Sequence, residues 1–316
     1  MNPGGTMFKY ILKRLLAGVL TIIVLITVAF FLMHAMPGSP FSIEEQKKLT
    51  PEGLARLNAK YGLDKPVWEQ YITYWEGLLE FDFGTSFKKP DTSVNEIIFG
   101  HFPTSAKVGG VAVLVSLLIG IPLGIAAALN RGKIIDGFCM VFATVGISAP
   151  VFVISVVLMY VFCGVIPIFP NFGLNNWQSY VLPVACLSFS PIAYIARQTR
   201  SSMLDCMGQD YIRTARAKGV TEFKVVVKHA LKNALTPVIT YLGTLIASLL
   251  TGSFVVERMF SISGIGRYFV QSISDRDYTM IMGITIFFGV FVVVCNLITD
   301  IVLAVVDPRV KLTNNQ

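Results

Sequence analysis

The most informative part of the chain is Tyr211–Pro237, a cationic, helix-forming segment that separates two long apolar stretches. Asp210 is suited to cap a first helix, and the small residues Ala215 and Ala217 would permit close approach to another surface. Gly219 is placed to end that helix in a left-handed conformation, which a side chain would disfavour. Because charged loops between membrane spans are normally short, the pattern predicts a rigid element through which a cytosolic motor could apply force.

A second helix should follow this glycine. Thr221 can cap its start, and Glu222 carries a negative charge that suits the positive end of the helix dipole. Lysines then recur at four-residue spacing and indicate a solvent-facing or headgroup-facing stripe: Lys224, Lys228 and Lys232. An ordinary amphipathic surface helix would show the same stripe. The break at Gly219 favours instead a compact, protruding elbow, a name used below for residues 210–232.

Motifs for catalysis or metal binding are not found in the sequence. No GxxxxGK[ST] loop occurs, so the chain cannot cradle nucleotide phosphates by that route. The histidines His34, His101 and His229 lie at span ends or in loops and form no HExxH motif. The five cysteines show neither CxxC nor histidine-linked spacing, so no disulfide framework and no metal site is predicted. We therefore expect that the chain is not an enzyme.

Composition identifies a membrane protein. Of the 316 residues, 54% are hydrophobic and 14% are charged, against roughly 25% charged residues in a soluble domain, and mean hydropathy is +0.66. A membrane-spanning helix needs about 20 mostly apolar residues. Six stretches meet this need and predict an all-α polytopic membrane protein: Leu15–Met36, Val108–Leu129, Phe138–Ile166, Tyr180–Ala196, Leu235–Val256 and Met280–Val306. The third contains Pro150 near its middle and should be kinked or tilted.

The distribution of basic residues predicts the orientation. The N-terminal stretch, the links between spans two and three and between spans four and five, and the C-terminal tail hold 15 of the 26 basic residues and six acids, if Asp300 at the end of the last span is counted. The other loops hold 11 basic and 13 acidic residues. The positive-inside rule therefore places both termini and the elbow in the cytoplasm. The formal net charge of +7 is thus a signal of topology, and we expect no nucleic-acid partner.

The largest region outside the predicted spans is Gly38–Lys107, which this topology places on the outer side. Thr50 and Pro51 have the residue types of a helix start, and Gly62 should end that helix. Pro66 should open a second helix that carries aromatic residues on one face. Since Tyr and Trp favour the membrane–water interface, we expect both helices to lie across the outer surface.

Two roles fit this outer segment. It could be a packed cover without a specific partner, or it could be a docking platform for a soluble protein. The docking candidates are its aromatic residues Trp68, Trp75, Phe83 and Phe87. The sequence FDFGTSF (Phe81–Phe87), with three aromatic residues about a glycine turn, should fasten the segment to the membrane core.

A polar stripe within the fifth predicted span is a candidate wall of a translocation pathway. Hydroxyl side chains recur at steps of four, four and three residues, which places them on one helical face: Thr240, Thr244, Ser248 and Thr251. Small polar residues in membrane helices also serve helix packing or bond their own backbone. The sequence leaves both interpretations open for this stripe.

Several motifs together resemble the membrane subunits of binding-protein-dependent ABC importers, in the peptide-permease branch. Arg213-Thr214-Ala215 and Gly219 fill the places of the Glu-Ala-Ala…Gly pattern of the general family, with the glutamate absent. The peptide branch is similar also at MPGSPF, DFGTSF, ISAPVF, TGSFVVERMFSISGIG, RDYT and DPRVKL, although Ser263 stands where proline is usual. The resemblance covers essentially the whole chain and is strongest to the first of the two membrane subunits of oligopeptide permeases.

This resemblance implies a type I ABC importer permease fold, with six transmembrane helices and an external helical insert. It divides the chain into a cytoplasmic N-terminus with the first span (1–37), the insert (38–107), the permease core (108–306) and a cytoplasmic tail (307–316). It also implies residence in a bacterial plasma membrane. The residues implied to couple to an ATPase belong to the elbow: Tyr211, Arg213, Thr214, Ala215, Arg216, Ala217, Lys218 and Gly219.

The same resemblance implies the partners. A second homologous permease subunit would complete the pathway, and an external binding protein would deliver oligopeptides. Two cytosolic ABC ATPases would bind ATP and Mg²⁺, so that this chain would itself hold no cofactor. The same machinery could instead import dipeptides, nickel chelates, glutathione or cell-wall peptides, because the sequence does not specify the cargo.

An ion-coupled secondary transporter is the alternative from another class. Such transporters bury ionisable residues near the middle of the bilayer. Only Asp300, close to the inner end of the last span, comes near this requirement, and capping or an interhelical bond would explain it as well. Inverted internal repeats, which many such transporters contain, are not visible.

Overall fold

The computed structural model describes residues 3–35, 50–89 and 91–306, and this part of the chain is almost entirely helical. Five of its helical spans are long and apolar enough to cross a membrane, and a bent helix pair supplies a sixth. The five are α1 (Pro3–Ala35), α5 (Val94–Leu129), α8 (Gln178–Met207), α12 (Thr236–Leu250) with α13 (Phe254–Met259), and α15 (Tyr278–Val306). The MPGSPF and DPRVKL motifs, the predicted boundary at residues 37–38 and the predicted tail lie outside the described residues.

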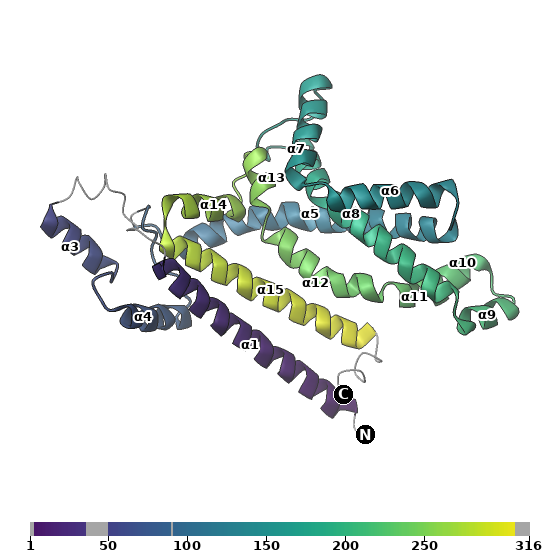
Figure 1. Ribbon diagram of the computed structural model, residues 1–316, viewed down its shortest axis with the longest axis horizontal. Coiled ribbons are helices and arrows are strands. Elements are labelled where there is room, and N and C mark those ends of the chain that lie inside the picture. The colour runs from purple at the N-terminus through teal and green to yellow at the C-terminus, as the bar shows by residue number, and fades with distance from the viewer. Residues whose placement is uncertain (1–2, 36–49, 90, 307–316) are drawn as a thin grey trace.

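The bent helix pair is the third span in chain order, and it is broken rather than kinked. Its halves α6 (Ile134–Ser148) and α7 (Val151–Met159) are bent by 105° relative to each other, and a π-helical segment (Tyr160–Val165) continues α7. Pro150 has no backbone N–H and stands at the N-cap of α7, while Ala149 before it is extended with ψ 123°. The break is therefore sharper than the predicted kink. Figure 1 shows α7 projecting away from the other helices.

α5 begins earlier than its hydropathy predicts. Ser93 accepts a hydrogen bond from the N–H of Asn95 (3.2 Å) and caps the helix, which then runs from Val94 without interruption. The sequence-based span starts at Val108, because the polar residues before it lower the local hydropathy. Residues 94–107, which the sequence assigns to the outer insert, are thus the first turns of this membrane helix.

The most extensive helix–helix contact joins α5 to α8 at the centre of the bundle. Gly124 permits this approach, because a Cβ at that position would lie 2.5 Å from the Cβ of Thr199. Small residues allow helix backbones to approach closely in membranes, where van der Waals packing holds helices together. The small residues of α5 therefore position α8, which carries the functional segment at its end.

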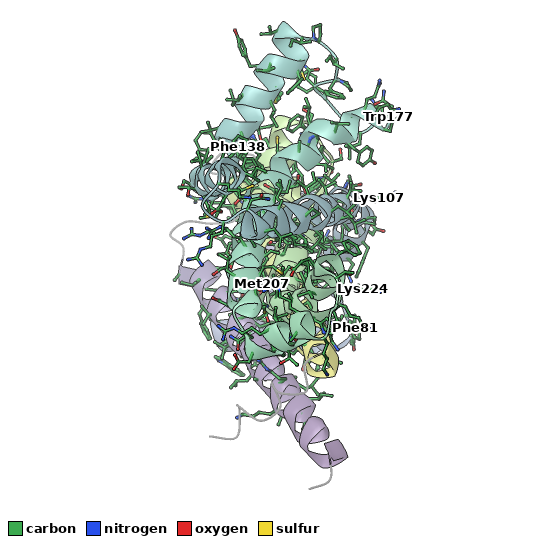
Figure 2. All side chains as sticks on the ribbon, turned by 90° about the vertical axis from the view of Figure 1, so that its right-hand side faces the viewer. Phe81, Lys107, Phe138, Trp177, Met207 and Lys224 are labelled. Carbon is green, nitrogen blue, oxygen red and sulfur yellow. The ribbon has the colours of Figure 1, made fainter. Side chains whose placement is uncertain are left out.

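Large apolar side chains cover much of the outside of the helices. Leu118 of α5 is 74% exposed and Ile134 of α6 is 90% exposed. Figure 2 labels two more, Phe138 of α6 and Trp177 just before α8, which are 71% and 74% exposed. Soluble monomers rarely expose apolar surface on this scale. A lipid bilayer or a neighbouring membrane subunit would cover it, in agreement with the composition.

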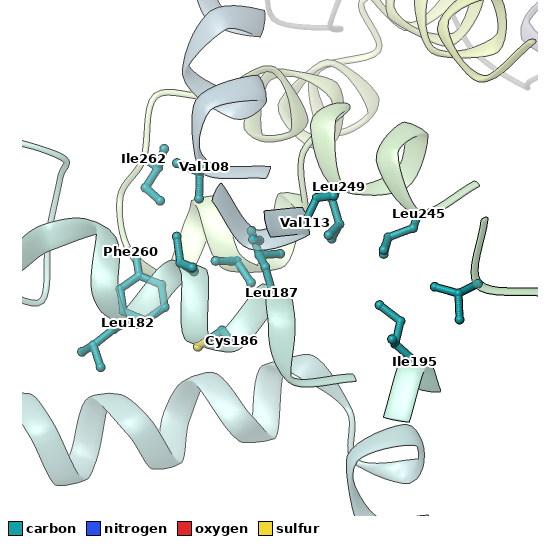
Figure 3. Packing of buried hydrophobic residues seen from close by; sticks show 14 residues of the cluster. Val108, Val113, Leu182, Cys186, Leu187, Ile195, Leu245, Leu249, Phe260 and Ile262 are labelled. Carbon is teal, nitrogen blue, oxygen red and sulfur yellow. The ribbon is translucent and has the colours of Figure 1, made fainter. Parts of the chain in front are cut away.

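The main hydrophobic core lies where α5, α8 and α12 meet, next to α13. Its fully buried side chains include Ile195 of α8, Leu245 of α12 and Phe260 just after α13. Figure 3 shows Phe260 near Leu182 at one side of this core and Leu245 near Ile195 at the other, with Leu187 between them. Because lipid is as apolar as these residues, close packing rather than exclusion of water stabilises the contact within a membrane.

α1 and α15 run side by side (Figure 1). Arg14 Nε lies 3.2 Å from Asp300 Oδ2, which joins the two helices by an ion pair. The interhelical bond that the sequence offers for Asp300 is thus present. This contact accounts for Asp300 by helix packing, so its presence near the end of the span gives no specific support to the ion-coupled alternative.

Before α5, the described part of the outer insert contains two short helices, α3 (Pro51–Lys60) and α4 (Val67–Leu79). Thr50 caps α3 by accepting a hydrogen bond from the N–H of Gly53 (3.2 Å), and Gly62 follows the helix with φ +67°. Both positions confirm the sequence-based prediction.

The insert packs onto the C-terminal end of α1 through α4. The hydroxyl groups of Tyr71 and Thr27 lie 2.7 Å apart, and His34 Nε2 lies 3.0 Å from Gln70 Oε1. The Phe30 ring meets the Tyr71 ring edge-on at a centroid distance of 5.2 Å. The contacts fix α4 against a membrane helix, as expected for a segment that lies across the outer surface.

The FDFGTSF sequence fastens the insert to the start of α15. Ser86 Oγ donates to the carboxylate of Asp277, which also accepts the N–H of Phe87 (3.1 Å). Thr279 Oγ1 donates to the carbonyl of Thr85 (2.8 Å). The predicted anchoring role is confirmed, and its partner is the RDYT motif. The Phe81 side chain is 82% exposed and takes no part, although its carbonyl accepts a hydrogen bond from Asn95 Nδ2 of α5 (2.6 Å).

Candidate coupling elbow and pathway face

The first arm of the elbow is α9 (Asp210–Ala217). Gln209 stands at its N-cap and makes no side-chain cap bond, and Asp210 is the first helical residue. The capping role predicted for Asp210 is therefore wrong by one position. Its carboxylate still lies in the first turn, where a negative charge favours the helix dipole, and Oδ1 is 3.6 Å from Arg213 Nη1.

The turn after α9 contains the predicted left-handed glycine. Gly219 has φ +74°, and its N–H donates to the carbonyl of Arg216 (2.9 Å). The N–H of Val220 donates to the carbonyl of Ala215 (3.2 Å), which completes the two bonds of a Schellman motif. No heavy atom lies within 4 Å of the place that a Cβ on Gly219 would take. The backbone conformation, rather than lack of space, therefore requires glycine here.

The second arm joins α10 (Glu222–Lys224), a π-helical segment (Val225–Ala230) and α11 (Leu231–Ala234). Thr221 stands at its N-cap as predicted, but the hydroxyl makes no cap bond. The two arms are tied by Arg216, whose Nε and Nη2 donate to the carboxylate of Glu222 at 2.7 and 3.2 Å. These hydrogen bonds lower the pKa of Glu222 and raise that of Arg216. Sequence analysis missed this ion pair across the turn.

One face of the elbow packs against the end of α8. Ile212 and Ala215 of the first arm and Val225 of the second arm are buried in one cluster with Met203 of α8. Ala215 is 7% exposed, so its small side chain does not meet another protein, contrary to the prediction. Instead it lets α9 lie close to the second arm. The elbow is a packed unit joined to a central membrane helix.

The opposite face of the elbow is exposed. Tyr211 is 40% exposed, and its hydroxyl accepts a hydrogen bond from Asn233 Nδ2 (3.1 Å). Figure 2 views the molecule from the end at which the elbow lies, and it labels Met207 and Lys224, which belongs to the exposed lysine stripe. The start of α1, the end of α15 and the elbow lie toward the same end (Figure 1). The other exposed coupling candidates are Arg213, Thr214, Arg216, Ala217, Lys218 and Gly219.

Three of the four hydroxyl residues predicted on the fifth span share an exposed face. Thr240, Thr244 and Ser248 of α12 are exposed. Thr251 is only 7% exposed, so its side chain does not reach this face. Its hydroxyl donates to the carbonyl of Ala247 (2.8 Å), and the hydroxyls of Thr240 and Ser248 likewise donate to backbone carbonyls of α12. The prediction for Thr251 is wrong because α12 ends there and the chain turns into α13.

A second polar stripe, which sequence analysis missed, runs along α8. This helix is mostly buried, yet Tyr194, Arg197, Ser201 and Asp205 are exposed at steps of three, four and four residues, on one narrow face. Tyr194 and Tyr241 of α12 pack ring against ring, with centroids 4.2 Å apart. The two stripes therefore border one surface, called below the pathway face. The helical spacing of polar residues on α8 was its signal in the sequence.

The four docking candidates of the insert differ in their surroundings. Trp68 is 61% exposed, whereas Trp75 is partly buried and meets Tyr71 edge-on at 6.3 Å. Phe83 packs against a cluster formed by α5, α14 (Ile265–Asp275) and α15. The Phe87 ring lies 4.5 Å from that of Tyr61. Trp68 is thus the member of this set whose side chain is largely free to meet another molecule.

The motif between α12 and α14 is organised around a buried carboxylate. Glu257 accepts hydrogen bonds from Ser105 Oγ (2.7 Å) and from the N–H of Arg267 (2.9 Å). Ser105 Oγ in turn accepts the N–H of Ile265 (2.9 Å). A Cβ on Gly264 would collide with the Glu257 carboxylate, which explains the glycine at that place. A side chain of α13 and one of α5 thus cap the start of α14 jointly.

Comparison with known proteins covers nearly the whole chain. Residues 120–312 match the family described as binding-protein-dependent transport system inner membrane component, and residues 7–109 match its N-terminal part. The chain is 46% identical over 307 residues to the dipeptide transport system permease protein DppB of Bacillus subtilis, covering 97% of this chain and 99% of the relative. It is 40% identical over 307 residues to the oligopeptide transport system permease protein OppB of Salmonella typhimurium, covering 96% of this chain and all of the relative.

Among solved structures, the inward-facing MetNI methionine ABC transporter shares the fold. The TM-score is 0.54 at 17% sequence identity, over 67% of this chain and 96% of the other. The same assignment follows from the glycine-centred elbow, from the apolar spans and from the matches to the two family models. The chain belongs to the family of binding-protein-dependent transport system inner membrane components.

Proposed function

We propose that this chain is the membrane subunit of an ATP-driven importer of short peptides and forms half of its translocation pathway. Full-length similarity to peptide permeases carries the proposal. The elbow supports it independently, because it is a packed unit with one exposed face, joined to a central membrane helix, as a subunit driven by a separate ATPase requires.

In this proposal two cytosolic ATPases, which bind ATP and Mg²⁺, engage one elbow each. The contact surface is the exposed face of the elbow: Tyr211, Arg213, Thr214, Arg216, Ala217, Lys218 and Gly219. Ala215 contributes indirectly by holding α9 against the second arm. Because the elbow packs on the end of α8, a displacement of the elbow would move a helix that borders the pathway face.

A second homologous permease subunit completes the pathway in this account. The pathway face of one chain exposes hydroxyl groups and a guanidinium, which lipid would solvate poorly. A facing subunit would enclose these groups in a shared, water-filled route. Both termini and the elbow are on the cytoplasmic side of a bacterial plasma membrane, and an external binding protein docks on the outer face, with Trp68 as one contact.

The cargo class follows from the relatives, whose names refer to dipeptides at 46% and 42% identity and to oligopeptides at 39–41%. Short peptides are the class common to both groups. We retain the sequence-based expectation of oligopeptides as cargo. Dipeptides are the second candidate, because two relatives of higher identity are named as dipeptide permeases.

Reconstitution tests this proposal. Alone in proteoliposomes, the chain should neither hydrolyse ATP nor accumulate peptide. Adding the second permease subunit, the ATPases and the binding protein should confer both activities, and a labelled series from dipeptide to hexapeptide would identify the preferred length. Uptake by the lone chain along a proton gradient would replace this account with a secondary transporter.

A further inference from the structure

Two arginines on α8, three residues apart, have different surroundings. Arg200 Nη2 donates to Asp136 Oδ2 (2.8 Å), and the same carboxylate oxygen accepts the N–H of Gly132 (2.9 Å). Arg200 is thus neutralised within the fold. Arg197 is exposed and makes no hydrogen bond or ion pair with any other residue that the structure describes.

Arg197 lies at the inner end of the pathway face. It follows Tyr194 by one helical turn on α8, and the Tyr194 ring contacts that of Tyr241 of α12 with the two planes tilted by 37°. Tyr241 is five residues from the start of α12 at Thr236, or about 7.5 Å at 1.5 Å per residue. The tyrosine pair and the arginine therefore occupy the third of the span nearest the elbow, where cargo would leave toward the cytoplasm.

The chemistry of these groups suits one feature of a peptide. A guanidinium is planar and presents paired N–H donors that match a carboxylate. The two phenol rings beside it offer apolar surface that can contact side chains of varied shape. Peptides of any sequence share a C-terminal carboxylate, so a single arginine could recognise all of them without selecting among side chains.

We propose that Arg197, beside the Tyr194–Tyr241 pair, binds the C-terminal carboxylate of a peptide leaving the pathway. This inference rests on the proposed function, since it requires that peptides pass along this face. It adds a contact that selects for a free C-terminus, on a face that also exposes hydroxyl groups and, about two turns further along α8, the carboxylate of Asp205. A lipid phosphate could use the same guanidinium, and the experiment separates the two ligands.

The test measures uptake of one labelled peptide as free acid and as C-terminal amide by the complete importer at saturating loaded binding protein. Arg197→Gln should lower the acid-to-amide uptake ratio about tenfold relative to the unmodified complex, the low end for a hydrogen bond to a charged group. Lys228→Gln, which removes an exposed charge on the elbow instead, should leave the ratio unchanged.

An unchanged acid-to-amide uptake ratio in Arg197→Gln would overturn the inference. If uptake of both peptides fell by the same factor, so that the ratio stayed unchanged, the result would indicate that Arg197 anchors a lipid instead. If the glutamine variant does not assemble, Arg197→Lys keeps the charge without the paired donors and should lower the ratio in the same direction. Absence of peptide uptake by the unmodified complex would instead refute the proposed function itself.

Discussion

Replacing Gly219 by valine should uncouple the importer while leaving the protein in the membrane. The residue has φ +74°, and no heavy atom would meet a new Cβ within 4 Å, so the cost comes from the backbone alone. A non-glycine residue in this region stores about 1–3 kcal/mol, which corresponds to a roughly 5- to 150-fold smaller population of the native turn. The Schellman bonds to Arg216 and Ala215 would be weakened first.

The assay is ATP hydrolysis by the assembled complex, stimulated by peptide-loaded binding protein. Stimulation should decrease in the order glycine, asparagine, alanine, valine at position 219, because asparagine tolerates positive φ better than the other side chains. Gly62→Val is the matched control: Gly62 has φ +67°, also with open space around it, but lies in the outer insert. Normal stimulation in Gly219→Val would refute the coupling role of this turn.

Three further outcomes are expected. In a cysteine-free background, a cysteine at Lys60 should react with an impermeant maleimide in intact cells and one at Lys224 should not; the reverse pattern would overturn the orientation. The ion pair between Arg216 and Glu222 should persist at neutral pH, because it lowers the pKa of Glu222 below its ordinary value of 4.5. It should be lost as the pH falls below 4.5 and through the lowered pKa, so amide hydrogen exchange in the elbow should rise over that pH range. Glu222→Gln should remove this pH-dependent rise. Glu257→Gln should turn an amide N–H₂ toward a buried donor and destabilise the start of α14 by about 1–3 kcal/mol; unchanged trypsin cleavage after Arg267 would contradict this.

The sequence predicts the membrane class, six spans and the elbow because these depend on local patterns. Apolar length specifies the spans, and a glycine between two helical patterns specifies the turn at Gly219. Pro150 marks the right place for a break, but its angle depends on the packing of α7. The start of α5 was missed since a helix cap at Ser93 outweighs the polar composition that follows.

The details of the candidate site depend on tertiary contacts that no local pattern records. Ala215 and Thr251 have suitable residue types and spacing, yet both are buried by neighbouring elements. The pair between Arg216 and Glu222 requires the turn to bring two arms together. Arg197 is distinguished from Arg200 only by the position of Asp136 on another helix. Such differences appear once the helices are placed in three dimensions.

The central claim is that the elbow receives force from an ATPase, and site-specific crosslinking tests it most directly. A photo-crosslinking residue at Lys218, exposed beside Gly219, should capture the ATPase subunit in the assembled complex. The same residue at Trp68 of the outer insert should not. Capture of the ATPase from position 68 and not from position 218 would contradict the account.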